Sequence, residues 1–411
     1  MFTDDLSPTL PLHRRRPPAV VLGDLTLVRP HGMAGIPVVV ATTDPADVTL
    51  RSRYVSGHVV LPGFEGADLE RSAVALLELG ARLADASGGP VPLVYGTDRH
   101  LELLYRYRHE LARYYLFLLN DVELGWALHD KARFAALCAA RGVLAPKTAD
   151  PGYDPAGALA ALREPLVVKP KCKASWAELK AELFGGEGKA RAFATRDELL
   201  AHPGFVKHAR SLLVQEQVDC DTADLCSFHG FADARGRLLA SFGGRKVRTF
   251  PEFAGESSLI ELTDDPAVER AGRDAARALG LKGPFKIDLA RDRASGRYYT
   301  LEVNARYTLW NYLGAVHGVN LPAVAYAYLV DGRAPVAPPP YAPRYRWLNF
   351  YRDAKAFRER HPRGRLGAAE WASSVAPGHL IYELFAWTDP APFLHWAGRL
   401  VATRTRRAAG A

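Results

Sequence analysis

Polar side chains recur at every second position in two short segments of the chain. Lys286 and Asp288 belong to the first segment, and Thr300, Glu302 and Asn304 to the second. Strand side chains alternate between two faces, so each segment predicts a strand with its polar residues on one face. The sequence RDRASGR between them has the composition of a hairpin turn. Folding the hairpin would bring all five side chains onto one surface.

Two carboxylates and an amide carbonyl on one strand face form a set of oxygen ligands. Such a set repels itself unless a cation neutralises it, and hard oxygen ligands suit Mg²⁺. An ordinary solvated face of an amphipathic hairpin alternates in the same way. Other features of the sequence are therefore needed to distinguish a metal site from a solvated surface.

The composition is that of a soluble globular protein with two or three domains. The chain has 411 residues, of which 48% are hydrophobic and 24% charged. No apolar run has the length of a membrane helix, and the N-terminal residues lack the apolar segment of a signal peptide. The four cysteines show no metal-binding spacing. These features predict a cytoplasmic protein without a membrane segment.

The net charge of +8 raises the question of a polyanionic partner. The arginines are scattered, apart from short clusters at 13–16 and 404–407, and no nucleic-acid recognition motif accompanies them. We therefore do not expect a nucleic acid to be the partner. A site for phosphates and carboxylates uses positive charge equally well.

Residues 18–125 predict an α/β domain with a doubly wound parallel sheet. The apolar runs AVVLG, IPVVVAT, HVVLPG and PVPLVYGT alternate with helical stretches, as buried parallel strands do. The first strand-to-helix turn, GDLTLVR, lacks the G-x-G-x-x-G of a dinucleotide site, which excludes a Rossmann dehydrogenase. The cations in residues 51–54 are expected at the surface.

Residues 126–208 predict a second unit. Its first helix begins after Asp130, a good N-cap, and stops at Gly142. A buried strand, PLVVKP, ends in Lys169 and Pro170.

A glycine-rich loop, GGEGK, follows that strand within the second unit. Gly186 and Gly188 would leave backbone amides unobstructed, and Lys189 adds a positive charge. A loop that covers phosphates requires these properties, although most glycine-rich loops are only turns.

Residues 209–333 predict a strand, SLLVQEQV, an antiparallel meander and the hairpin described above. The segment RKVRTFP of this region is expected to be a loop that closes over the active site. Arg248 in that loop would hold a substrate carboxylate, because the planar guanidinium fork matches a carboxylate bidentately. Residues 334–411 begin with a Pro-rich linker and end in a small cap.

The succession of these segments resembles the ATP-grasp superfamily. The resemblance rests on the D-K helix start, V-V-K-P, G-G-E-G-K, V-Q-E-Q-V and the x-K-x-D…L-E-V-N-A-R hairpin, over residues 125–330. It is greatest with the carboxylate–amine ligase or carboligase branch, which includes D-aspartate ligases. The resemblance implies an α/β ATP-grasp fold with an N-terminal domain (18–125), a small subdomain (126–208), a large subdomain carrying the hairpin (209–333) and a C-terminal extension (334–411).

The resemblance also implies roles for individual residues. Mg²⁺ would be held by Asp288, Glu302 and Asn304, while Lys286 and Arg306 would neutralise the transferred phosphoryl group. Either Glu216 or Asp221 would hold the ribose. The residues implied at the ATP site are Lys131, Lys169, Gly186, Gly188, Lys189, Gln215, Glu216, Val218 and Asp221.

The implied activity is that of an ATP-dependent, ADP-forming ligase. A small carboxylic acid would be activated as an acyl phosphate and joined to an amine, with ATP and Mg²⁺ as cofactors. Two alternatives stay open: a carboxylase that uses carboxyphosphate, and a nucleotide-binding protein without turnover. The sequence identifies neither the acid nor the amine, and it leaves the oligomeric state open.

Overall fold

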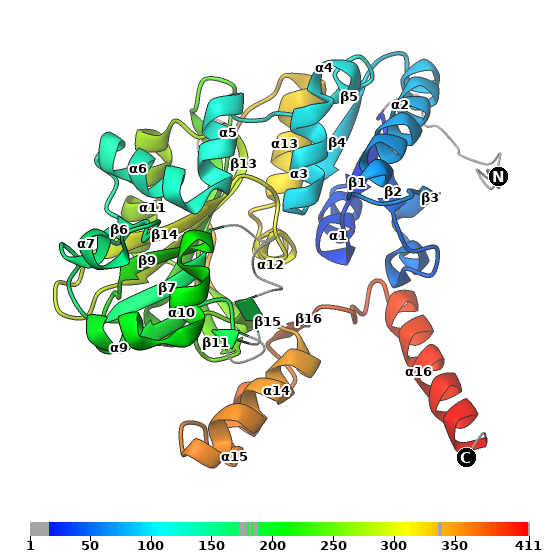
Figure 1. Ribbon diagram of the computed structural model, residues 1–411. Coiled ribbons are helices and arrows are strands. Elements are labelled where there is room, and N and C mark those ends of the chain that lie inside the picture. Colours follow the sequence, from blue (N-terminus) through cyan, green and yellow to red (C-terminus); the bar gives the residue numbers. More distant parts are fainter. Residues whose placement is uncertain (1–15, 172–178, 181, 185–187, 336–338, 410–411) are drawn as a thin grey trace.

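The chain folds around three β-sheets that follow one another along the sequence (Figure 1). The computed structural model describes residues 16–171, 179–180, 182–184, 188–335 and 339–409, with the side chains of the last helix described as far as residue 400.

The N-terminal sheet has five strands, which are all parallel and lie in the order β3-β2-β1-β4-β5. Continuous apolar strands with helices between them confirm the predicted doubly wound domain. Its elements are β1 (Ala19–Leu22), α1 (Leu25–Met33), β2 (Val38–Thr42), the 3-10 helix η1 (Val48–Arg51), β3 (Val55–Val60), α2 (Ala67–Ser87), β4 (Val91–Tyr95), α3 (Asp98–Arg106), α4 (Arg108–Leu111) and β5 (Tyr115–Leu116).

A second, four-stranded sheet has the order β6-β9-β7-β8 and its own hydrophobic core. Helix α6 of this unit begins where predicted: the Asp130 carboxylate accepts from the backbone N–H of Ala132 and Arg133, and Gly142 ends the helix at φ +66°. The elements are α5 (Val122–His129), α6 (Lys131–Arg141), β6 (Thr148–Ala149), α7 (Pro155–Leu159), β7 (Leu166–Pro170), β8 (Arg191–Phe193), α9 (Arg196–Ala201), α10 (Pro203–His208) and β9 (Leu212–Glu216).

The third sheet has seven strands in the order β14-β13-β10-β11-β12-β15-β16. Helix α11 packs on one face of this sheet. Gly272 of the helix lies so close to the ring of Phe228 that no side chain would fit at position 272. The elements up to residue 331 are β10 (Leu225–Ala232), β11 (Leu238–Phe250), β12 (Glu256–Thr263), α11 (Pro266–Leu279), β13 (Gly283–Arg291), β14 (Tyr298–Asn304), α12 (Trp310–Val316) and α13 (Leu321–Asp331).

The C-terminal segment is more than the predicted linker and cap, because it contributes two strands to the large sheet. Strand β15 pairs antiparallel with β12, with Leu348 opposite Leu259, and β16 pairs parallel with β15. The elements of the segment are β15 (Arg346–Leu348), α14 (Phe350–Arg360), α15 (Ala368–Ser374), β16 (Leu380–Tyr382) and α16 (Ala391–Ala409).

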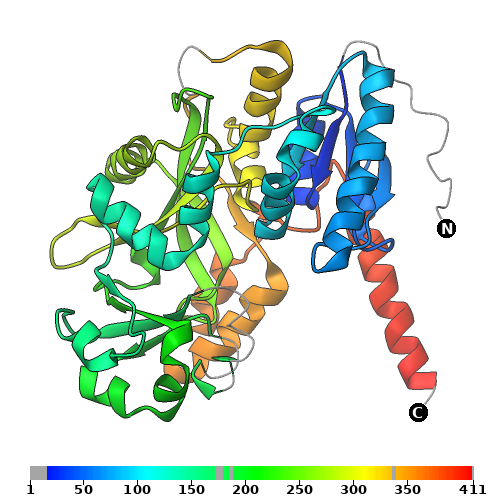
Figure 2. The ribbon, with the colours of Figure 1, turned by 45° about the horizontal axis from the view of Figure 1, so that its top comes forward.

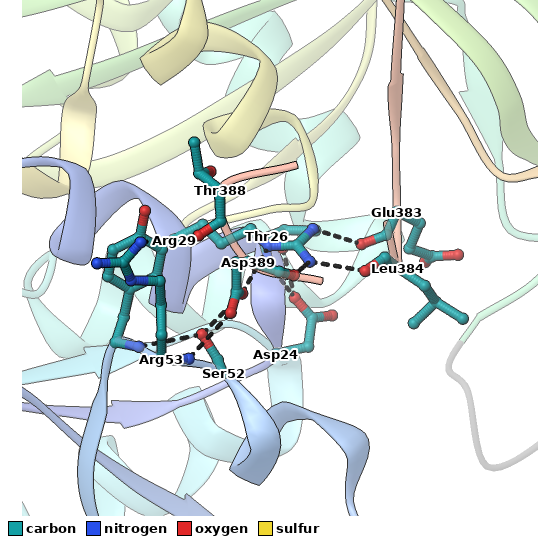
Figure 3. A network of polar contacts seen from close by, with 10 residues as sticks. Asp24, Thr26, Arg29, Ser52, Arg53, Glu383, Leu384, Thr388 and Asp389 are labelled. Atoms are coloured by element: carbon teal, nitrogen blue, oxygen red, sulfur yellow. Dashed lines mark hydrogen bonds and ion pairs between the residues drawn. The ribbon is translucent and has the colours of Figure 1, made fainter. Parts of the chain in front are cut away.

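The same segment then crosses to the N-terminal domain, where helix α16 lies apart from α14 and α15 (Figure 2). Figure 3 shows the buried network that fixes this crossing. Arg29 of α1 donates to the carboxylate of Asp389 (3.1 Å) and to the carbonyl oxygens of Glu383 (3.0 Å) and Leu384 (2.6 Å). The hydroxyl of Ser52 donates to the same carboxylate over 2.8 Å. Arg51 and Arg53 are exposed, as expected for surface charge, whereas Ser52 between them is buried in this network.

None of the single helices in the described part of the chain is both long and apolar enough to cross a membrane. One bent pair, α12 with α13, passes the same test of length and composition, with 87° between the two helices.

Candidate active site

The predicted hairpin is present, and its register brings four of the five polar side chains together. Lys286 of β13 lies opposite Asn304 of β14, and Asp288 lies opposite Glu302. Thr300 is the exception. The register shifts after Asp288, so Thr300 pairs with Leu289 on the core side of the sheet.

Asp288 is the centre of this surface and is held by two lysines. Its Oδ2 lies 2.7 Å from Nζ of Lys286, and its Oδ1 lies 2.9 Å from Nζ of Lys246 on β11. Asp288 is only 3% exposed. Burial alone would raise the pKa of this carboxyl, but the two ammonium groups outweigh it and hold the pKa well below its usual value. Asp288 is therefore ionised throughout the neutral range.

Lys246 was not predicted as a site residue from the sequence, because residues 245–251 were expected to form a loop. That expectation is wrong: strand β11 continues to Phe250. A bulge inserts Val247, so Lys246 and Arg248 pair with consecutive residues of β12 and point to opposite faces of the sheet. The only sequence signal for the position of Lys246 was the strand alternation of the preceding meander, which can be continued through the residues GGRK.

The predicted role of Arg248 in substrate binding is also overturned by its surroundings. Arg248 is 4% exposed, and its Nε and Nη2 each donate to the carboxylate of Asp353 in α14 over 2.9 Å. Ser258 and Trp371 donate to the same carboxylate over 2.8 Å. The guanidinium fork is fully used in anchoring the C-terminal segment to the large sheet.

Glu302 and Asn304 are the other two predicted oxygen ligands of the hairpin. Glu302 is exposed, and its Oε1 accepts from Nδ2 of Asn304 over 3.1 Å. Within the described residues no three His, Cys, Asp or Glu side chains gather into a metal site. Two carboxylates plus the amide oxygen of Asn304 nevertheless form a hard, all-oxygen donor set, which fits Mg²⁺.

Arg306 connects the hairpin to the N-terminal domain. Its Nη2 donates to Oδ1 of Asn304 over 2.9 Å, its Nη1 to the carbonyl oxygen of Gly96 over 3.3 Å, and its Nε pairs with the carboxylate of Asp98. An amide oxygen has two lone pairs, so Oδ1 of Asn304 can accept from Arg306 and still bind a cation. Arg306 thus lies beside the predicted metal ligands.

Lys169 approaches the hairpin from the small sheet. It lies near the end of β7, and its electrostatic neighbours include Glu302, Asp288 and Lys131. Burial lowers the pKa of Lys169 to about 8, an effect that Glu302 partly offsets. Nζ of Lys131, the first residue of α6, donates to the carbonyl oxygen of Pro170 over 3.0 Å. Lys169 of the small subdomain therefore faces two carboxylates of the large one, with Lys131 close to it.

The predicted adenine and ribose residues divide between the faces of the small sheet. Gln215 of β9 pairs with Val167 and so shares the face of Lys169, and it donates to Oγ1 of Thr148 over 2.9 Å. Glu216 pairs with Leu166 on the opposite face.

On that opposite face, the carboxylate of Glu216 pairs with the exposed side chain of Arg163 over 3.0 Å. Asp221, the other ribose candidate, is exposed and pairs with Arg293 of the hairpin turn (3.1 Å). Val218 lies between them in the connection that follows β9. Asp221 thus contacts the hairpin turn, whereas the carboxylate of Glu216 is engaged by Arg163.

The glycine-rich loop is described only in part. Gly186 lies outside the described residues. A side chain at Gly188 would lie 2.7 Å from the carbonyl oxygen of Phe184, which explains the glycine there. Lys189 is exposed, and its Nζ pairs with Oε1 of Glu256 at the start of β12 over 2.7 Å. The loop is thereby connected to the large sheet.

The arrangement of the sheets has counterparts among solved structures. No protein-family model matches the sequence, and neither does any curated protein. The biotin carboxylase of Campylobacter jejuni is similar with a TM-score of 0.57 and 13% identity, over 78% of this chain and 72% of that one. The L-amino acid ligase of Bacillus licheniformis is similar with a TM-score of 0.54 and 17% identity, over 77% and 74%.

Pyruvate carboxylase of Rhizobium etli is similar with a TM-score of 0.56 and 13% identity, over 78% of this chain. The match spans 29% of the length of that larger protein. These structural neighbours have the ATP-grasp fold, and the protein described here has it too.

Proposed function

We propose that this protein is an ATP-dependent, ADP-forming carboxylate–amine ligase. The observation that carries the proposal is the pairing of Asp288 with Lys246 and Lys286 on one sheet, opposite Lys169 on another. Phosphoryl transfer requires little covalent participation by the protein and depends on positioning and on neutralising charge. Two facing groups of cations, with carboxylates between them, supply both the positioning and the neutralisation of charge.

In the proposed reaction, a carboxylate oxygen of the acid attacks the γ-phosphorus of ATP, and the bond to the bridging oxygen of ADP breaks. The amine nitrogen then attacks the acyl carbon, phosphate leaves, and the nitrogen loses a proton as the amide forms. Lys131 and Lys169 would bind the phosphates of the nucleotide from the small sheet. Lys246, Lys286 and Arg306 would balance the charge of the phosphoryl group as it moves.

Asp288, Glu302 and Asn304 would hold Mg²⁺, which supplies further charge neutralisation at the terminal phosphates when it is bound. Glu302 is the member of this set best suited to mutagenesis, because its exposed side chain supports little of the fold. By contrast, Asp288→Asn would leave Lys246 and Lys286 without their buried partner. That variant would mix a loss of stability with a loss of catalysis.

The experiment is ADP release across a library of amino acids, other small acids and amines, with hydroxylamine present to trap an acyl phosphate. We expect ADP release that depends on one acid, yields a hydroxamate, and falls about a hundredfold or more in Glu302→Gln, the scale of losing one electrostatic group. ADP release that requires bicarbonate alone would favour a carboxylase. Unchanged turnover in Glu302→Gln would refute the assignment of the hairpin.

A further inference from the structure

Helix α16 carries an apolar stripe that lies largely at the surface of the protein. Phe393, Trp396, Ala397 and Leu400 recur at the i, i+3, i+4, i+7 spacing of one helix face. Trp396 and Leu400 are exposed, and so is Leu394 beside them, at 63%. In a globular protein such a stripe normally faces the core. Its position on α16 therefore calls for an occupant.

A different face of α16 contacts the N-terminal domain. The helix packs on η1, and Nη1 of Arg399 donates to the carbonyl oxygen of Ala46 over 2.9 Å. Pro392, which is buried, lies seven residues before Arg399 and so shares its face of the helix. At 100° per residue, this face is roughly a quarter of a turn from the middle of the apolar stripe. The N-terminal domain thus holds the helix and leaves the stripe at the surface.

The stripe continues into a cluster of aromatic rings that precedes the helix. The ring centroid of Phe385 lies 5.5 Å from that of Phe393 and 4.8 Å from that of Trp387, and the rings of Phe393 and Trp396 are 5.9 Å apart. Trp387 is 89% exposed. Single exposed apolar side chains are ordinary, but a contiguous group marks an interaction surface. We call the following residues the C-terminal apolar patch: Trp387, Phe393, Leu394, Trp396 and Leu400.

The segment that carries the C-terminal apolar patch is positively charged. Residues 390–411 contain no Asp or Glu, whereas arginine stands at positions 399, 404, 406 and 407. The carboxylate just before this segment, that of Asp389, is buried and paired with Arg29. In both ribbon views the last turns of α16 project away from the rest of the chain (Figures 1 and 2). Tryptophan, phenylalanine and leucine together with several arginines are typical of a helix that lies in a membrane surface.

A second copy of the chain is less suited to cover the patch than a lipid surface. Pairing two α16 helices would bring the arginines of both copies together, with no carboxylate in residues 390–411 of either copy to balance them. A bilayer with anionic lipids instead supplies an apolar layer for the patch and negative charge for the arginines. Each arginine near such a surface strengthens binding about fivefold. Charge complementarity therefore favours the lipid surface.

We propose that the C-terminal apolar patch binds the surface of a membrane that contains anionic lipids. The exposed Trp387, Leu394 and Trp396 enter the boundary between headgroups and acyl chains, and the arginines of the segment attract the lipid phosphates. The helix lies in that surface and does not cross the bilayer, so it needs no long apolar run. This binding holds the ATP-grasp domains at the membrane, and it does not depend on the proposed ligase function.

The test is co-sedimentation of the full chain with lipid vesicles. One set of vesicles consists of phosphatidylcholine alone, and the other also contains the anionic lipid phosphatidylglycerol. We expect the anionic vesicles to bind the protein about tenfold or more tightly than the neutral ones. Added salt should weaken this binding, because it screens the charges of the arginines and the lipids. Equal binding to the two sets, or binding to neither, would overturn the proposal.

The double variant Leu394→Gln with Leu400→Gln removes apolar area from the patch and leaves the charge unchanged. It should reduce the affinity for anionic vesicles about tenfold or more, because two leucines no longer leave water on binding. Val74→Gln with Val206→Gln is the matched control, since these side chains are 50% and 63% exposed on α2 and α10. Melting temperatures check that both double variants are folded, and an equal loss of affinity in the two would contradict a role for the patch.

Light scattering of the full chain without vesicles measures the alternative occupant. We expect the wild type and the variant Leu394→Gln with Leu400→Gln to have the same oligomeric state. A dimer that the wild type forms and this variant loses would assign the patch to a second copy and overturn the proposal. No turnover is involved in these measurements, so the absence of ADP release in the library assay would refute the ligase and leave them standing.

Discussion

Nζ of Lys246 lies 2.9 Å from Oδ1 of Asp288, and this ion pair joins the central strand β11 to strand β13 of the hairpin. The other oxygen of the carboxylate is occupied by Lys286. The carboxylate is therefore fixed from two sides before any ligand arrives. Preorganised charge of this kind costs little reorganisation during the reaction, which is why it stabilises transition states well.

We predict that Lys246→Gln lowers kcat by about a hundredfold or more, the typical loss when one electrostatic group is removed from a phosphoryl-transfer site. Asp288 keeps Lys286 as a partner, so the variant should remain folded. Arg245→Gln is the matched control, because Arg245 is the preceding residue and pairs with Glu261 on the opposite face. Steady-state ADP release measures both variants, and equal losses in the two would contradict a specific role for Lys246.

The hairpin was predictable from the sequence because its signal is local: alternating polar residues on either side of a turn. The bulges at Leu301 and Val247 were not, because an inserted residue leaves no local mark and yet reverses the faces of all residues beyond it. This is why Thr300 was assigned to the wrong surface, whereas Arg248 was expected in a loop where strand β11 in fact continues. Strands β15 and β16 have three residues each, too few to show alternation, and their pairing depends on contacts distant in sequence.

A second prediction concerns the pH dependence of nucleotide binding. Only protonated Lys169 attracts a phosphate, and in the ligand-free protein its pKa is about 8. The affinity for an ATP analogue should therefore fall as pH rises above 8, by up to tenfold per pH unit. Calorimetric titrations between pH 6.5 and 9.5 measure this. Lys169→Arg, which stays charged over that range, should abolish this fall in affinity above pH 8. A fall that persists in the variant would show that another group titrates.

The same shift predicts an effect of Lys169 on stability. Its pKa in the folded protein, about 8, lies below the reference value of 10.5, so the unfolded chain binds the proton more tightly. The destabilisation is fully present below pH 8 and is relieved as pH rises from 8 toward 10.5. Lys169→Met should accordingly raise the melting temperature at pH 7, although it weakens ATP binding by about 1.5–3 kcal/mol, the scale of a charge-assisted hydrogen bond. A lower melting temperature would contradict this account.

A fourth prediction separates a structural from a substrate-binding role for Arg248. Breaking a buried bidentate pair is strongly destabilising, so Arg248→Lys should lower the free energy of unfolding by about 2–4 kcal/mol. Arg245→Lys, in the more exposed pair with Glu261, should lower it by about 1 kcal/mol or less. Urea unfolding measures both. If Arg248→Lys instead left stability intact and raised the KM of the acid, Arg248 would belong to the substrate after all.

The final prediction concerns the crossing of the C-terminal segment to the N-terminal domain. The side chains of Arg29 and Asp389 are 1% and 0% exposed, and the carboxylate also accepts from the hydroxyl of Ser52 and the backbone N–H of Arg53 (Figure 3). Asp389→Ala leaves the guanidinium of Arg29 buried without its counterion, a loss of about 3–5 kcal/mol. Because the pair joins segments 360 positions apart, its loss should release the connection between β16 and α16.

We therefore expect Asp389→Ala to be cleaved much faster than the wild type near residues 384–390 in limited proteolysis, with the sites read by mass spectrometry. Arg53→Ala is the matched control, because it keeps the backbone N–H that bonds Asp389 and removes only a side chain at the surface of the same network. The double variant Arg29→Met with Asp389→Leu should recover most of the resistance, since it removes both charges and keeps apolar volume in the buried space. Cleavage of Asp389→Ala at the wild-type rate would mean that the packing of α16 on η1, rather than the ion pair, holds the segment in place.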